Sequence, residues 1–193
     1  MLLCIPFAWI FLFPSDIKDF SQSLIAISTF SSNFLFWQES GYFETAAELK
    51  PLLHTWSLSV EEQYYILFPV FLIVAWKFGE KWIINFLILI FIMSLCTAHW
   101  ASYNAPSANF YLLPTRGWEL LLGVFTAFFI KNNDFFKSKI INQFASIVGS
   151  IFIFFSIFTY DDKTPFPGLF ALLPTVGTAL LIMTGIKDTL VYK

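Results

Sequence analysis

The chain has 193 residues, of which 58% are hydrophobic and only 12% are charged. Because charged and polar residues normally cover most of a soluble domain, this composition excludes an ordinary soluble fold and favours a membrane protein. The formal net charge of −2 excludes the strongly basic surface that nucleic-acid binding requires, so no nucleic-acid partner is expected.

The chain opens with an apolar run over residues 1–13, which is short for a membrane span of about 20 residues. It has no basic n-region and no small-residue cleavage site, so the pattern argues against a signal peptide. We therefore expect a partial helix and an internal piece of a longer protein. Residues 17–37 are serine-rich and moderately apolar. They are predicted to form a helix inside a bundle, because hydroxyl and small residues favour close helix contact.

The rest of the chain alternates between long apolar runs and short polar loops. Further helices are predicted over residues 52–76, 82–100, 113–130, 140–159 and 169–186. Pro69 and Pro174 should bend the first and the last of these, because proline removes a backbone hydrogen bond. Residues 101–112 are expected to form an uncharged loop. The sequence thus predicts an all-α fold, a polytopic transmembrane bundle of about six to seven helices, the first partial, in one domain over residues 1–193.

The lysines alternate between successive loops. The loops at 77–81, 131–139 and 187–193 are lysine-rich, whereas those at 38–51, 101–112 and 160–168 hold only Lys50 and Lys163. Cytoplasmic loops carry the excess of Lys and Arg, so the lysine-rich side is predicted to be cytoplasmic.

With this orientation, two predicted helices enter from the outer face with charges near their entrances. Glu61 and Glu62 lie about 12–14 Å along the first helix, and Arg116 and Glu119 lie in the first two turns of the second. Because membrane-embedded ionisable residues usually pair or line a wet cavity, we expect these four side chains to meet in the outer half of the membrane. Two alternatives stay open. The glutamates face water among the headgroups, or the charges only pin helices together.

His54 is a weaker candidate for the same site. It shares one helix face with Leu58, Glu61 and Tyr65 by their spacing of three and four residues. Its place at a helix entrance beside Trp56 equally suits a residue that anchors the helix at the membrane interface.

Metal and redox chemistry find no support in the sequence. It contains no CxxC, no HExxH, no Gly-rich phosphate loop and no Gly-x-Ser-x-Gly, and Cys4 and Cys96 lie in apolar segments where they are interpreted as packing residues. No metal is therefore expected.

Two long motifs carry a family resemblance. Residues 53–69, LHTWSLSVEEQYYILFP, resemble the hallmark segment of acyltransferase family 3, the integral-membrane O-acyltransferases that modify cell-surface polysaccharides. Residues 110–123, FYLLPTRGWELLLG, resemble the family's second motif. Shorter pieces that also fit are residues 32–37, 40–43, 48–51 and 164–168. The chain is most similar to the bacterial branch that O-acetylates O-antigen or lipopolysaccharide.

The resemblance implies a reaction and its participants. An acyl group, usually acetyl, would pass from acyl-CoA (acetyl-CoA) to a hydroxyl of a cell-surface polysaccharide or lipopolysaccharide. The acceptor would be a glycan or a lipid-linked sugar, and the protein would be a multi-pass protein among the lipids of the bacterial cytoplasmic (inner) membrane. Arg116 would stabilise developing negative charge, and Glu61 or Glu62 would orient the acceptor hydroxyl or the arginine.

The resemblance also implies missing parts. An early helix of the family carries an arginine and a histidine thought central to acyl transfer, and we expect it to precede residue 1. His54 is therefore not assigned that role. Two alternatives to an acyltransferase are a membrane transporter segment, which helices broken by proline would suit, and a truncated inactive remnant. The sequence contains no internal repeat of the broken helices, which argues against the transporter.

Overall fold

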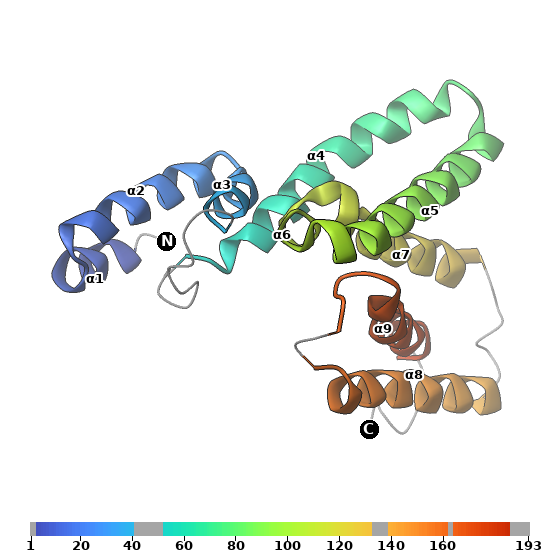
Figure 1. The fold of residues 1–193 in the computed structure, drawn as a ribbon. Coiled ribbons are helices and arrows are strands. Elements are labelled where there is room, and N and C mark those ends of the chain that lie inside the picture. Colours follow the sequence, from blue (N-terminus) through green and yellow to red (C-terminus); the bar gives the residue numbers. More distant parts are fainter. Residues whose placement is uncertain (1–2, 41–51, 133–138, 162–163, 186–193) are drawn as a thin grey trace. The chain divides into compact units, whose positions relative to one another are not determined.

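A computed structural model describes residues 3–40, 52–132, 139–161 and 164–185. The chain divides into two compact units (Figure 1). The first consists of Met1–Glu80 and Phe110–Leu113, and the second of Lys81–Asn109 and Pro114–Lys193. Much of the predicted loops at 38–51, 131–139 and 187–193 lies outside the described residues, as do most of the motif pieces at 40–43 and 48–51.

The described part of the first unit contains four helices before residue 80. They are α1 (Cys4–Phe11), α2 (Pro14–Ser28), α3 (Ser32–Glu39) and α4 (Thr55–Trp76). A small apolar cluster of Ala8, Phe20, Ile27 and Leu52 joins α1 and α2 to the residues that precede α4. Pro69 lies inside α4 as predicted, and the bend expected there stays a prediction.

The single helix predicted over residues 17–37 is wrong, because the chain turns between α2 and α3. Phe30 has a φ of 53°, which places it in the left-handed region. The Ser31 N–H bonds the Ala26 carbonyl at 2.8 Å, and the Phe30 N–H bonds the Ile27 carbonyl at 3.1 Å. This hydrogen-bond pattern is a common way to end a helix, usually with glycine at the left-handed position. The apolar periodicity gave no sign of the break because Phe30 is itself apolar.

The remaining described helices follow in order. They are α5 (Glu80–Asn104), α6 (Pro106–Tyr111), α7 (Leu113–Asn132), α8 (Lys139–Thr159), the 3-10 turn η3 (Leu169–Ala171) and α9 (Leu172–Thr184). Pro174 lies in the first turn of α9, where proline is well tolerated.

The loop predicted over residues 101–112 is also wrong. The helix α5 continues to Asn104 because Ala101 and Ser102 are buried against the rest of the unit. The chain then starts α6 at Pro106, a favourable residue for a first helical turn. The uncharged residues of this segment therefore belong to packed helices and not to a loop.

In the second unit, α8 and α9 pack against each other (Figure 1). Their backbones come closest at Gly149 and Gly177. A Cβ at Gly149 would lie 2.7 Å from the Gly177 carbonyl oxygen, and a Cβ at Gly177 would lie 2.8 Å from the Gly149 carbonyl oxygen. Small residues at such a contact are typical of membrane helix pairs.

The all-α, membrane-spanning fold class is confirmed. Within the described residues the structure contains helices and turns without strands. Three helical stretches are long and apolar enough to cross a membrane: Thr55–Trp76, Trp82–Asn104 and Ile140–Thr159. The apolar stretch Leu169–Thr184 is shorter. The helix α7 is not among the three, and it is the one that carries Arg116 and Glu119.

Candidate functional site

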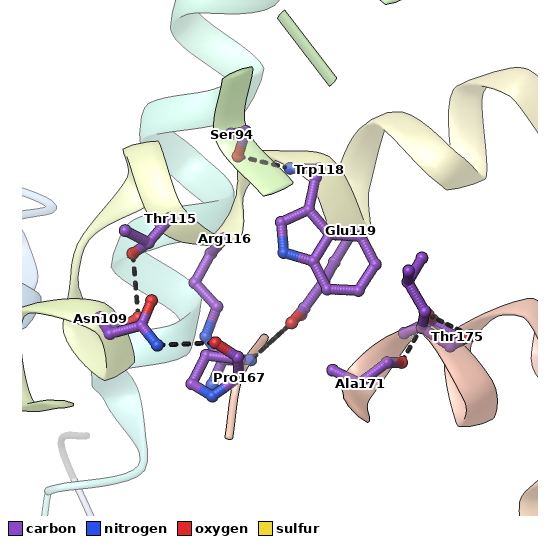
Figure 2. A network of polar contacts seen from close by, with 10 residues as sticks. Ser94, Asn109, Thr115, Arg116, Trp118, Glu119, Pro167, Ala171 and Thr175 are labelled. Carbon is purple, nitrogen blue, oxygen red and sulfur yellow. Dashed lines mark hydrogen bonds and ion pairs between the residues drawn. The ribbon is translucent and has the colours of Figure 1, made fainter. Parts of the chain in front are cut away.

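The first two turns of α7 carry Arg116 and Glu119. Nη1 of Arg116 donates to both carboxylate oxygens of Glu119, at 3.0 and 3.1 Å. Figure 2 shows the two side chains turned toward each other. They are 14% and 24% exposed, so the pair is largely shielded from solvent. The spacing of three residues places both side chains on one side of the helix. Of the four charged residues that were expected to meet, these two are in contact.

Neighbouring segments hold this turn in place. The hydroxyl of Thr115 donates to the Asn109 carbonyl at 2.9 Å, and the side-chain amide of Asn109 donates to the Pro167 carbonyl at 2.6 Å (Figure 2). In addition, the backbone N–H of Trp118 donates to the Ser94 hydroxyl at 3.0 Å. The turn that bears the ion pair is thus tied to α5, to α6 and to the Pro-rich segment that precedes η3.

The side chain of Trp118, which lies between Arg116 and Glu119 in the sequence, belongs to a buried apolar cluster. It is fully buried, together with Ala98 and Ala171. Phe91 meets its ring edge-on, with 6.2 Å between ring centroids. Its indole Nε1 and the Asn109 Oδ1 are buried without a hydrogen-bond partner. Buried polar atoms usually have a hydrogen-bond partner, so these two atoms could accept a bond from or donate one to a bound molecule.

In the first unit, Glu61 and Glu62 belong to a helix that α3 holds by buried polar contacts. The Ser32 hydroxyl contacts the Ser59 hydroxyl at 2.7 Å and donates to the Thr55 carbonyl at 3.0 Å. Ser32 and Ser59 are almost completely buried. These contacts fix which side of α4 faces α3.

One turn further along α4, an amide chain continues the contact. Nε2 of Gln63 donates to the Asn33 Oδ1 and to the Phe30 carbonyl, both at 2.8 Å. Nδ2 of Asn33, which is fully buried, donates to the Tyr111 carbonyl at 3.1 Å. Burial, followed by the negative charge of Glu39, raises the pKa of Tyr111, so its phenol stays protonated at neutral pH.

The side of α4 with the sequence-predicted residues is a different one. Leu58 and Tyr65 are 46% and 59% exposed, His54 is exposed, and Glu61 and Glu62 are half-buried. His54 precedes the helix as its N-cap residue without a side-chain capping bond. The polar contacts with α3 come from Thr55, Ser59 and Gln63, while His54 is exposed.

Glu61 and Glu62 lie in the first unit, and Arg116 and Glu119 lie in the second. Each unit is described by itself, so the meeting of these four side chains stays a prediction. Among the described residues, no three His, Cys, Asp or Glu side chains form a group that could hold a metal ion.

Sequence reasoning missed several residues that shape both regions. Asn33, Gln63, Asn109 and Trp118 lie inside or next to the family-like motifs, where a polar or aromatic residue in an apolar helix was an available signal. Ser94 lies in an uncharged run without any motif, so nothing in the sequence pointed to it.

Comparison with known proteins agrees with the motifs. A family model described as an acyltransferase domain matches residues 1–188. An uncharacterized protein of Haemophilus influenzae is 33% identical over 180 residues, which cover 88% of this chain and 73% of that protein. The peptidoglycan O-acetyltransferase OatA of Listeria monocytogenes is 30% identical over 181 residues, which cover 86% of this chain and 28% of OatA. No solved structure matches the chain.

Proposed function

The chain belongs to acyltransferase family 3, and on that premise we propose that it forms part of a membrane O-acyltransferase that acylates a hydroxyl of a cell-envelope glycan. The donor is acyl-CoA, in the first place acetyl-CoA. The protein crosses the bacterial inner membrane several times, with its lysine-rich loops in the cytoplasm. The observation that carries the proposal is the shielded Arg116–Glu119 pair in the first two turns of α7.

The reaction makes few demands on the protein. The acyl carbon–sulfur bond of the thioester breaks and an acyl carbon–oxygen bond to the sugar forms, while the hydroxyl proton ends on the released thiol. The carbonyl oxygen gains negative charge on the way, and a fixed donor at that oxygen lowers the barrier. Arg116 is that donor, because its guanidinium is permanently charged and Glu119 holds it in one orientation.

Glu119 has a second effect on this step. The carboxylate of Glu119, paired with Arg116, keeps the guanidinium from turning toward other anions. It also balances the positive charge of Arg116 while no substrate is bound. Glu61 or Glu62 orients the acceptor hydroxyl or the arginine in this proposal. The base that takes the hydroxyl proton is not assigned to any residue of this chain.

The acceptor is a glycan hydroxyl, and two sources supply it. The name of OatA specifies peptidoglycan, and lipopolysaccharide is the second acceptor that we propose. Both acceptors offer sugar hydroxyls, so a direct test has to present each of them separately.

The test uses membranes that contain the whole protein, labelled acetyl-CoA, and either lipopolysaccharide or peptidoglycan as acceptor. Arg116→Ala should lower acetyl transfer by about 100-fold or more, the loss typical of removing one donor to a developing oxyanion. Lys131→Ala, which removes a positive charge from the last turn of the same helix, is the matched control and should transfer acetyl normally.

Three results would contradict the proposal. They are normal transfer by the Arg116→Ala variant, no acetylation of either glycan by the unchanged protein, and transport of labelled glycan without any acetyl donor. The last result would favour a transporter instead.

A further inference from the structure

Ser94 of α5 contacts the first turn of α7 in an unusual way. Its hydroxyl donates to the Pro114 carbonyl at 2.6 Å and accepts from the Trp118 N–H at 3.0 Å (Figure 2 shows the second contact). Ser94 is 7% exposed and Trp118 is fully buried, so water does not compete for these two bonds.

The two bonded groups belong to the same turn of the same helix. Pro114 and Trp118 are four residues apart, and in an uninterrupted α-helix this N–H and this carbonyl bond each other. A hydroxyl from another helix that bonds both groups ties this turn of α7 to α5 at two points. Ser94 is therefore more than a contact between two helix surfaces.

Gly117 lies beside this hydroxyl. A Cβ at Gly117 would be 3.5 Å from the Ser94 Oγ, which is an ordinary van der Waals contact. The side of α7 that meets Ser94 thus carries no side chain at this point, and the hydroxyl reaches the backbone directly.

Arg116 lies between the two anchored residues, and Glu119 follows directly after the second. The rotation and tilt of this turn decide where the guanidinium points. We infer that Ser94 is a positioning residue, whose hydroxyl sets the orientation of the first turn of α7 and hence of the Arg116–Glu119 pair. The inference deepens the proposed function and rests on it for its effect on catalysis, but not for its effect on geometry.

A positioning role and a purely structural role predict different results. When Ser94 becomes alanine, the Trp118 N–H and the Pro114 carbonyl remain free to bond each other. The protein then keeps the hydrogen bonds within α7 and most of its stability, while the turn loses its tie to α5 and shifts its orientation. A purely structural role predicts a loss of stability, with activity lost in proportion.

The geometric experiment needs no acyl transfer. A thiol probe is placed by Glu119→Cys in a protein whose Cys4 and Cys96 are replaced by serine, and its reaction rate with a charged thiosulfonate is measured. Adding Ser94→Ala should change this rate by about threefold or more, because a turned helix end changes the exposure of the thiol. Ser94→Thr keeps the hydroxyl and should leave the rate unchanged.

Thr97→Ala is the matched control. Thr97 lies one turn further along α5, and its hydroxyl bonds the Met93 and Ser94 carbonyls of its own helix at 2.9 and 2.8 Å. Removing that hydroxyl should leave the labelling rate unchanged. Equal labelling rates in the Ser94→Ala and unchanged backgrounds would overturn the inference, whatever the protein catalyses.

The catalytic experiment follows in the protein with Arg116 and Glu119 intact. Ser94→Ala should lower kcat by about tenfold or more with KM changed less than about twofold, since small misplacements of a catalytic group cost rate and not binding. Ser94→Thr should restore most of the rate. An activity loss shared equally by Thr97→Ala, or one that only follows a lower unfolding temperature, would refute the positioning role. A labelling change without acetyl transfer by any variant would support the positioning role and refute the proposed function.

Discussion

Replacing Gly149 by alanine should weaken the pairing of α8 with α9. Alanine in the middle of a helix is normally favourable by about 1 kcal/mol relative to glycine. Here the added Cβ would lie 2.7 Å from the Gly177 carbonyl oxygen and 3.1 Å from the Leu180 Cβ. The first of these atoms is backbone, so the helices themselves must separate to make room.

The expected size follows from these opposing effects. Overpacking of a tight contact costs about 1–3 kcal/mol, which exceeds the gain in helix propensity and leaves a net loss of about 1 kcal/mol. For a chain of this length, 1 kcal/mol corresponds to about 2–4 °C in Tm. The Gly149→Ala protein should therefore unfold about 2–4 °C earlier, as followed by tryptophan fluorescence of the purified protein in detergent.

Gly123→Ala is the matched control for this measurement. Gly123 lies inside α7, and a Cβ there would meet nothing within 4 Å. The same substitution should then show only the propensity gain and raise Tm by about 2–4 °C. If both variants gained stability alike, the close approach of α8 and α9 would not exist in the protein. A second substitution, Gly177→Ala, should add less than its separate cost, because the helices have already moved apart.

Two further predictions concern the first unit. Asn33→Ala removes the donor to the Tyr111 carbonyl and the acceptor for Gln63, so the free energy of unfolding should fall by about 1–3 kcal/mol. Gln38 is exposed on the same helix, and Gln38→Ala should change this free energy little. An equal effect of both variants in thermal unfolding would contradict the buried amide chain. Because Phe30 has a φ of 53°, Phe30→Gly should be about 1 kcal/mol more stable than Phe30→Ala; the same unfolding measurement on both variants tests this, and equal midpoints would rule out the left-handed turn.

Local features of the sequence were enough for the fold class and for the main residues of interest. The length of the apolar runs indicated membrane helices, and the stretch of residues 140–159 matched α8 within one residue at its start. A charged pair three residues apart in an apolar run identified Arg116 and Glu119, and their ion pair is present. Such features depend only on neighbours along the chain, so no tertiary information was needed.

Breaks between helices were predicted less well. The turn at Phe30 depends on a left-handed conformation that the Gln63 side chain supports from another helix. The end of α5 and the helix α6, where a loop was predicted over residues 101–112, depend on burial of uncharged residues that also suit a loop. In both cases the deciding contact comes from a distant part of the chain, which composition and spacing do not report.

Only the tertiary structure shows which polar groups meet. Asn33 bonds the Tyr111 carbonyl across 78 residues of sequence, and Asn109 bonds the Pro167 carbonyl across 58. A serine such as Ser94 looks the same in sequence whether it bonds its own helix or another. The sequence determined that this chain is a membrane protein with charges placed near helix ends, because apolar runs and charges are local properties. The packing of helices decided which hydroxyl and amide groups hold those charges in place, because a buried polar group bonds whatever partner the fold brings within reach.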